Sequence, residues 1–417
     1  MTIKKIAIIG AGFTGLTLSY RLGLKGHHVE LFEKEAKPGG LAIGFSQKGW
    51  DWPLEKHYHH LFTNDNAILS LLQDLRIPTL TPPSQTSVFY QNKIYPFNTP
   101  SQILSFSPLS PLNRSRLALV SAYLKLLPKD LAISLEKTTA ASWIKKYYGN
   151  QIYQIIWEPL LTGKFSQYKD VVNAAWFWAR IKKRTFKLVY IQGGFHVLAE
   201  KLDEQIKALG GKIYYQSVFD AKIKDQFDKI IVTTPTSVFL KMFPHLPKDY
   251  TGKLITIPHL HALNMLIVSK KQFLTDGTYW LNINDRQFPF IAVVEHTNFI
   301  DKSHYGDNHL IYIGNYLPPN HPYLKMSKEE LFKLYLPFLK KINPSFNFTL
   351  NALHFELFFG PFAQPVFPIN YSKHLPSFQT PIKNVYLANM DMVYPWDRGT
   401  NYAVELGNKI ADLIHLT

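Results

Sequence analysis

The chain has 417 residues, of which 46% are apolar and 18% charged. This composition is typical of a folded protein, and the length exceeds that of a domain built around a single hydrophobic core. It contains no cysteine, which excludes disulfides, thiolate metal ligands, thiol nucleophiles and any cofactor attached through a cysteinyl sulfur. The formal charge of +16 favours anionic partners, but no long Lys/Arg run typical of nucleic-acid binding occurs, so no nucleic-acid partner is expected.

The N-terminus combines two lysines with an apolar stretch, as a signal peptide does. That stretch contains three spaced glycines and Arg21 and lacks a small-residue cleavage site, so we interpret it as part of the folded protein. No run of about eighteen apolar residues predicts a transmembrane helix. We therefore expect a cytoplasmic protein, with peripheral contact at the membrane surface as a further option.

The first half of the chain predicts a βαβ opening followed by a helical insertion. The expected N-terminal elements are a strand at 6–9, a helix at 14–24, a strand at 29–32, a helix at 66–76 and a hairpin at 87–95. Residues 100–184 are mainly helical and are interrupted by prolines.

The second half returns to alternating strands and helices around a sheet. The expected elements are strands at 190–194, 212–216 and 229–233, helices at 195–209 and 327–341, a strand at 384–388 and a helix at 401–414. Several β-rich runs between 254 and 316 are separated by turn residues, which predicts a largely antiparallel sheet.

Gly10, Gly12 and Gly15 lie between the first strand and the first helix, and Glu33 closes the next strand. The first glycine permits a tight turn, the second lets a pyrophosphate approach the backbone, and the third allows close helix–strand packing. Glu33 can accept hydrogen bonds from ribose hydroxyls and would repel the extra phosphate of NADP. Together these residues predict a dinucleotide-binding unit.

Gly39 and Gly40, six and seven residues after Glu33, resemble the glycine pair of the amine oxidase, protoporphyrinogen oxidase and phytoene desaturase superfamily. In that superfamily the pair lies against the pyrophosphate of FAD. The resemblance therefore implies FAD, held non-covalently because no cysteine is present to attach it. Leu41 occupies a position that is often arginine, which removes one expected pyrophosphate contact.

Two later segments resemble the remaining parts of the superfamily's FAD domain. Residues 190–235 are similar to its middle segment, in which the residue at Val218 contacts adenine through its backbone. Residues 384–407 are similar to its C-terminal segment, in which a positively polarised helix N-terminus faces the isoalloxazine ring. The resemblance implies further cofactor contacts at Phe13, Thr14, Lys34, Leu41, Thr234, Asn389, Met390, Arg398, Thr400, Asn401 and Tyr402.

Residues 57–65, followed by Tyr90, resemble the histidine loop of UDP-galactopyranose mutase. The loop is one residue shorter here, so His60 matches the flavin-facing histidine and becomes the candidate acid/base or orienting group. His59 and Tyr90 are candidate substrate contacts. On a strand, His57 and His59 would face opposite to His60, and no carboxylate cluster accompanies them, so no metal site is expected. The alternative is a structural role, in which these histidines form hydrogen bonds with backbone groups near a cofactor.

Two more candidates lie in the C-terminal part of the chain. Residues 359–368 form a proline-stiffened aromatic segment, in which Phe362 and Gln364 are possible substrate contacts if the segment lines a pocket rather than the core. Arg398 is the candidate for stabilising a reduced flavin or an anionic substrate. Pairing of Arg398 with Asp397 or Asp391 near a turn is the structural alternative.

Residues 101–127 combine Leu, Ile and Phe with three cations, Arg114, Arg116 and Lys125. Such a composition suits a helix at a membrane interface. An internal helical subdomain explains the same residues and is the interpretation that we favour.

These features predict an α/β protein with a Rossmann-like FAD-binding domain and a discontinuous α+β substrate domain. The substrate domain contains a mainly antiparallel sheet and an inserted helical region. The FAD-binding domain comprises residues 1–65, 186–240 and 376–417, and the substrate region comprises residues 66–185 and 241–375.

The predicted function is that of an FAD-dependent oxidoreductase, in which a hydride passes from an unidentified organic small molecule to the flavin. An anionic or lipid-linked substrate is compatible with the charge and composition. The alternatives are a mutase-like flavoenzyme that acts on a sugar nucleotide without net redox change and a non-catalytic FAD-binding protein.

Overall fold

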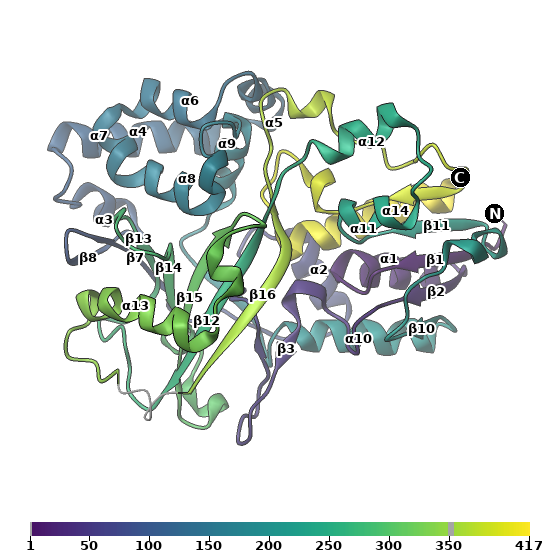
Figure 1. Ribbon diagram of the computed structural model, residues 1–417, viewed down its shortest axis with the longest axis horizontal. Coiled ribbons are helices and arrows are strands. Elements are labelled where there is room, and N and C mark those ends of the chain that lie inside the picture. The colour runs from purple at the N-terminus through teal and green to yellow at the C-terminus, as the bar shows by residue number, and fades with distance from the viewer. Residues whose placement is uncertain (1, 349–353) are drawn as a thin grey trace.

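The computed structural model describes residues 2–348 and 354–417, whose strands form two main sheets (Figure 1). The first sheet is parallel, with the order β10 (Lys212–Tyr214), β2 (His28–Phe32), β1 (Lys5–Ile9), β11 (Lys229–Val232) and β17 (Val385–Leu387). Strands from three distant parts of the chain thus complete one Rossmann-like sheet, so the predicted fold class is confirmed.

Three helices, from the start, the middle and the end of the chain, pack together beside this sheet. They are α1 (Phe13–Leu24), α10 (Phe195–Ala208) and α14 (Thr400–Leu416). A Cβ atom at Gly407 in α14 would lie 2.8 Å from the Thr14 carbonyl oxygen, so the close contact of α14 with α1 requires a glycine. On its other side α14 contacts α2 (Asn66–Asp74), whose Ile68 N–H donates to Asn401 Oδ1 at 3.2 Å.

The second sheet has seven strands and is antiparallel except where β13 pairs with β7. Its order is β16 (His354–Pro365), β12 (His259–Ser269), β15 (His309–Leu317), β14 (Ala292–Glu295), β13 (Thr278–Ile283), β7 (Gln85–Tyr90) and β8 (Lys93–Pro96). α13 (Lys328–Ile342) packs against β16, and α11 (Thr236–Met242) and α12 (Lys248–Ile255) connect the two sheets. The aromatic segment predicted at 359–368 lies largely in β16, which the pattern had not identified as a strand.

The predicted helical insertion forms a group at one end of the molecule, away from the chain termini (Figure 1). It contains α3 (Pro100–Leu104), α4 (Pro111–Leu126), α5 (Lys129–Ala132), α6 (Ala140–Tyr148), α7 (Asn150–Ile152), α8 (Glu158–Phe165) and α9 (Ala174–Lys183). These helices share a core of their own, with Trp143, Trp176 and Trp178 buried in it. Every helix in the described part of the chain is too short or too polar to cross a membrane.

The side chain of Glu55, in a short strand, is hydrogen-bonded to another short strand and to the start of α10. Glu55 ends β4 (Leu54–Glu55), which pairs with β3 (Gly44–Phe45), while β9 (Leu188–Ile191) pairs with β5 (Leu61–Phe62) and β6 (Thr79–Leu80). Its Oε1 accepts the Phe195 N–H at 2.7 Å, and its Oε2 accepts the Tyr190 hydroxyl at 2.8 Å. The side chain is 1% exposed, and burial raises its pKa to about 7.

Glu55→Gln tests this buried acid. Because the folded-state pKa is raised, the protonated carboxyl stabilises the fold below its unfolded-state pKa, and this contribution is lost as the pH rises through about 7. The variant cannot ionise, so its melting temperature relative to wild type should increase from about pH 5 to about pH 7 and level off by about pH 8. Other titrating groups contribute equally to both proteins and cancel in this difference. A difference in melting temperature that stays constant across this pH range would contradict the assignment.

Candidate functional site

In the turn from β1 to α1, Gly12 borders open space that a ligand could occupy, whereas Gly15 is packed too closely to carry a side chain. Gly10 has a φ of +104°, which residues with side chains rarely adopt. A Cβ atom at Gly15 would lie 1.9 Å from the Gly10 carbonyl oxygen, so α1 reaches the turn only because this residue is glycine. A Cβ atom at Gly12 would meet no described atom within 4 Å, which leaves the space above Gly12 open.

Glu33 and the glycine pair close this turn on two sides. Oε2 of Glu33 accepts the Ala11 N–H at 2.7 Å, and the side chain is 8% exposed. Gly39 N–H donates to the Ala11 carbonyl at 2.9 Å, and a Cβ atom at Gly40 would lie 3.2 Å from Gly12 Cα. The first turn of α1 carries no acidic residue, so its positive end is not neutralised. The arrangement fits a pyrophosphate held by backbone N–H groups.

Two other expected cofactor contacts carry buried oxygens that lack a partner among the described residues. They are Thr234 Oγ1 and the Tyr402 hydroxyl. Buried polar atoms are normally hydrogen-bonded, so both are available to a bound group. Asn389 is instead engaged within the protein, because its Nδ2 donates to the Thr234 carbonyl at 3.1 Å and to Thr236 Oγ1 at 3.0 Å.

The remaining expected cofactor contacts occupy mixed positions. Val218 is 79% exposed, so its side chain is not enclosed by the protein. Lys34 is exposed and pairs with Glu35 at 3.2 Å, and Asn401 holds α2 as described above. The others lie at the starts of α1 and α14 and in the turn after β17: Phe13, Thr14, Thr400 and Met390.

A small cavity, of about 20 Å³, is bordered by Leu41, the residue after the glycine pair. It is lined by Leu41, His57, Tyr58, His59, Ala262, Asn264, Tyr316, Ala363 and Arg398. The histidine segment enters it as irregular chain between β4 and β5, as the resemblance to a histidine loop implied. The segment packs by its side chains: a Cβ atom at Gly360 would lie 2.7 Å from His57 Nε2, and one at Gly314 would lie 2.6 Å from the Tyr58 hydroxyl.

His59 presents a neutral imidazole to this cavity. Its Nδ1 lies 2.5 Å from the His57 carbonyl oxygen. Since a carbonyl only accepts, Nδ1 carries the proton and Nε2 keeps its lone pair. Burial, with a smaller effect of Arg398, lowers the pKa of His59 to about 4. At neutral pH His59 can therefore accept a proton at Nε2.

His60, the sequence-based candidate for acid/base chemistry, lies outside the residues that line the cavity. Its ring packs against Phe62, Tyr279 and Trp280, and its Nδ1 lies 3.1 Å from the Tyr279 hydroxyl. Burial lowers its pKa to about 3. Its catalytic role stays a prediction. Among the described residues, no group of His, Asp and Glu side chains is arranged to hold a metal ion.

Arg398 lines the cavity from the segment before α14. Its Nε donates to Gln364 Oε1 at 3.2 Å, and its guanidinium lies 4.9 Å from the centre of the Tyr316 ring, a cation–π contact. Burial lowers its pKa to about 10, so it stays charged at neutral pH. In the described structure its guanidinium pairs with neither Asp397 nor Asp391; Asp397 accepts only its backbone N–H.

The carboxylate of Asp397 binds two other cations. Lys164 Nζ lies 2.9 Å from it and Arg180 Nη1 lies 3.4 Å from it. Burial lowers the pKa of Lys164 to about 7, although Asp397 opposes this effect. Arg184, just after α9, also has its pKa lowered by burial, to about 9. We call Lys164, Arg180, Arg184 and Arg398 the cation cluster; among the described residues, Asp397 pairs with two of its members, Lys164 and Arg180.

The three other candidate substrate contacts differ in their relation to the cavity. Gln364 is fully buried and reaches it through its hydrogen bond to Arg398. Phe362 places its backbone N–H 2.9 Å from His261 Nδ1, and neither Phe362 nor Tyr90 is among the lining residues. Tyr90 packs against the core of the helical group.

Sequence analysis missed several residues of this site. Lys164, Tyr316 and Asn264 were not predicted, and Asp397 was considered only as a partner for Arg398. The one available signal was the density of basic residues at 180–184, at the end of a helix whose preceding residues are apolar. The missed residues are far apart in the sequence and come together only in the folded structure.

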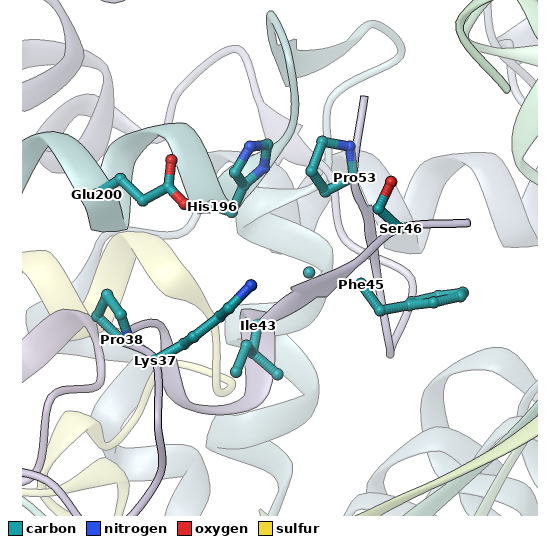
Figure 2. A pocket seen from close by; sticks show the side chains of 9 residues that line it. Lys37, Pro38, Ile43, Phe45, Ser46, Pro53, His196 and Glu200 are labelled. Atoms are coloured by element: carbon teal, nitrogen blue, oxygen red, sulfur yellow. The ribbon is translucent and has the colours of Figure 1, made fainter. Parts of the chain in front are cut away.

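A second cavity, of about 70 Å³, lies on the α10 side of the loop at 37–46 (Figure 2). His196 and Glu200 project from α10, and Lys37 extends from the loop (Figure 2). The Nδ1 atom of His196 is buried without a partner among the described residues. Lys37 and Glu200 are both exposed, so this cavity is a surface hollow that borders the segment containing the glycine pair.

Comparisons with known proteins place this geometry in a family. Residues 13–415 match the family described as flavin containing amine oxidoreductase. The chain is 24% identical over 310 residues to coproporphyrinogen III oxidase of Staphylococcus aureus, covering 59% of this chain and 64% of that protein. It is 24% identical over 168 residues to mitochondrial protoporphyrinogen oxidase of Nicotiana tabacum, covering 38% and 32% of the two chains.

A solved structure shows the same fold over the whole chain. Cyclohexylamine oxidase from Brevibacterium oxydans superposes with a TM-score of 0.74 at 12% identity, covering 100% of this chain and 99% of that chain. The chain spans less than two thirds of the length of the two curated relatives, whereas the family match covers nearly all of it. The chain therefore belongs to the flavin-containing amine oxidoreductase family of flavin-dependent oxidoreductases, which confirms the predicted superfamily.

Proposed function

We propose that the protein is an FAD-dependent oxidoreductase that oxidises an anionic organic small molecule, with FAD held non-covalently. The observation that carries this proposal is the open space above Gly12, which adjoins the glycine pair and has the Arg398 cavity beside it. The N–H groups at the start of α1 would hold the pyrophosphate, and Glu33 would bind the ribose. A bound flavin supplies the two-electron acceptor for a hydride from substrate carbon.

The residues of the cavity have separate roles in this proposal. His59, neutral and with Nε2 unprotonated, can accept a proton from the substrate, and its position makes it a stronger candidate than His60. Arg398 supplies a positive charge that favours a reduced, anionic flavin. Gln364 orients Arg398 through the hydrogen bond between Oε1 and Nε.

The cation cluster supports an anionic rather than a cationic substrate. The four cations of the cluster lie near one another, and Asp397 pairs with only two of them, Lys164 and Arg180, whereas a buried charge is costly unless it is paired. A carboxylate or phosphate on the substrate would complete the pairing. A free ammonium substrate would be repelled by the same cluster.

No observation favours the mutase-like or the non-catalytic alternative. Substrate-dependent bleaching of the flavin in the absence of oxygen separates the three functions. An oxidoreductase is bleached by its substrate, a mutase-like enzyme needs prior reduction to act, and a binding protein shows neither behaviour.

Gly12→Val tests cofactor binding without disturbing the fold. Wild-type protein should be yellow and should release intact FAD on denaturation. The variant should weaken FAD binding by about tenfold or more, because the new side chain fills the open space above the turn while the φ of −71° suits valine. FAD affinity is measured by fluorescence titration of apoprotein.

Gly252→Val is the matched control for this substitution. Gly252 also has no described atom within 4 Å of its would-be Cβ, and it lies in α12, away from the turn. The control should bind FAD as wild type does. Colourless wild-type protein that cannot be reconstituted with FAD would overturn the proposal.

Arg398→Ala tests the electrostatic role of the arginine. FAD content and melting temperature should be preserved, while the midpoint potential of the flavin falls and its reduction slows by about tenfold or more. Arg398→Lys should restore part of the effect, and Arg286→Ala, which removes an arginine whose side chain is 61% exposed, should change neither quantity. Loss of FAD with no redox change in the remaining protein would instead make Arg398 structural.

Lys164→Met tests recognition of anions, with benzoate as an anionic probe and benzylamine as its cationic counterpart. Lys164 is charged below its pKa of about 7, so benzoate should perturb the flavin spectrum at lower concentration near pH 6 than near pH 8. The variant should lose this pH dependence and bind benzoate about tenfold more weakly. Lys169→Met, which breaks the pair with Glu158, should behave as wild type. Preferential binding of benzylamine would refute an anionic substrate.

A further inference from the structure

The outer face of α4 exposes leucines at regular helical spacing. Leu112, Leu119 and Leu126 recur every seven residues and are 79%, 71% and 80% exposed. Residues seven apart lie on the same side of a helix, and Tyr123, 54% exposed, falls between the last two. Scattered exposed leucines are ordinary, but several large apolar side chains aligned along one side of a helix are typical of an interaction surface.

The inner face of the same helix is apolar as well. Leu117 and Leu124 are 2% and 0% exposed and lie in the core of the helical group. A helix with apolar side chains on both sides is usually covered on both. The stripe also has apolar neighbours on adjoining elements, since Leu131 of α5 is 63% exposed and Leu104 of α3 is 47% exposed.

The stretch of chain that carries this stripe has charges of one sign up to Asp130 in α5. Residues 75–129 contain no aspartate or glutamate but six lysines and arginines. Arg116 and Lys125 donate to backbone carbonyls, Arg116 to Tyr147 at 2.7 Å and Lys125 to Ile181 at 3.1 Å. No ion pair between described residues links the cations of this segment from Lys93 to Lys129 to a carboxylate, so their charge is uncompensated.

We propose that the α4 face, made of Leu112, Leu119, Tyr123 and Leu126 with the cations around them, docks on a lipid bilayer that contains anionic headgroups. Apolar side chains enter the boundary between headgroups and acyl chains, and each nearby lysine or arginine adds attraction to the anionic surface. A second copy of the chain is a poorer occupant, because a two-fold interface would place the same cations opposite each other.

The docking surface lies on the helix that supports part of the proposed active site. Lys125 at the end of α4 bonds the carbonyls of Ile181 and Lys182 in α9, each at 3.1 Å, and α9 carries Arg180 of the cation cluster. Docking itself does not depend on the proposed redox function, so vesicle binding and flavin chemistry can fail separately.

The test is co-sedimentation of the FAD-loaded, full-length protein with vesicles. One set contains phosphatidylcholine alone, and the other contains phosphatidylcholine mixed with phosphatidylglycerol. Wild-type protein should sediment with the mixed vesicles, much less with phosphatidylcholine, and less in high salt. The double variant Leu119→Gln/Leu126→Gln, which keeps every charge, should lose about tenfold or more of this binding.

The double variant Ile255→Gln/Leu416→Gln is the matched control. These residues are 70% and 73% exposed but belong to α12 and α14, so the control should bind vesicles as wild type does. Unchanged melting temperatures show that each variant is folded; if the α4 variant unfolds, the single change Leu112→Gln is used in its place.

Three outcomes would overturn the proposal. The first is folded wild-type protein that sediments with neither vesicle type, and the second is equal sedimentation with both types. The third is a dimer in light scattering that the α4 variant converts to monomer without any vesicle binding, which would show that the face covers a second copy of the chain.

Discussion

The contact between the first and the last helix determines where the start of α14 and the adjacent Arg398 lie. A Cβ atom at Gly407 would be 2.8 Å from both the Thr14 carbonyl oxygen and Thr17 Cβ, so α14 lies on α1 at a distance that only glycine permits. Because α14 begins at Thr400, two turns before this contact, its N-terminus and the adjacent Arg398 are positioned by the same packing. Any larger residue at Gly407 would move α14 outward and Arg398 with it.

The guanidinium of Arg398 is buried and has no carboxylate partner among the described residues. Asp397 is bound by Lys164 and Arg180, so it is unavailable to neutralise Arg398, which is held by the neutral side chain of Gln364 and by the ring of Tyr316. A neutral partner orients a cation without cancelling its charge. The cavity is therefore electropositive while its neighbouring histidine, His59, is uncharged, a combination suited to receiving negative charge and a proton at different atoms.

Much of the fold was predictable because local pattern and tertiary structure agree in it. The glycine fingerprint, the helical insertion and the antiparallel strands each have a period or a spacing that a short window of sequence reveals. β16 was missed because three prolines and a glycine at 359–368 lower the expected strand content. Proline is tolerated on an edge strand, and β16 is at the edge of its sheet.

The site was less predictable than the fold for a related reason. Lys164, Tyr316 and Asp397 come from α8, β15 and the segment before α14, and no local pattern links them. His57 and Tyr58 contact the sheet through side chains placed over Gly360 and Gly314, a contact that local sequence does not reveal. Local sequence thus singled out Leu41, His59 and Arg398 among the residues that line the cavity, but not Tyr316 or Asn264, and it did not single out Lys164 of the cation cluster.

Helix α9 connects two groups of cations, the cation cluster and the cations of α4. The end of α9 carries Arg180 and Arg184 toward the cation cluster, while its backbone carbonyls at Ile181 and Lys182 receive Lys125 from α4. An anion attracted to the carboxylate-free segment before Asp130 therefore approaches the protein next to the helix that carries part of the buried cluster. Since fields from both groups add, a negatively charged substrate held at an anionic surface would experience attraction from the protein that the surface itself does not provide.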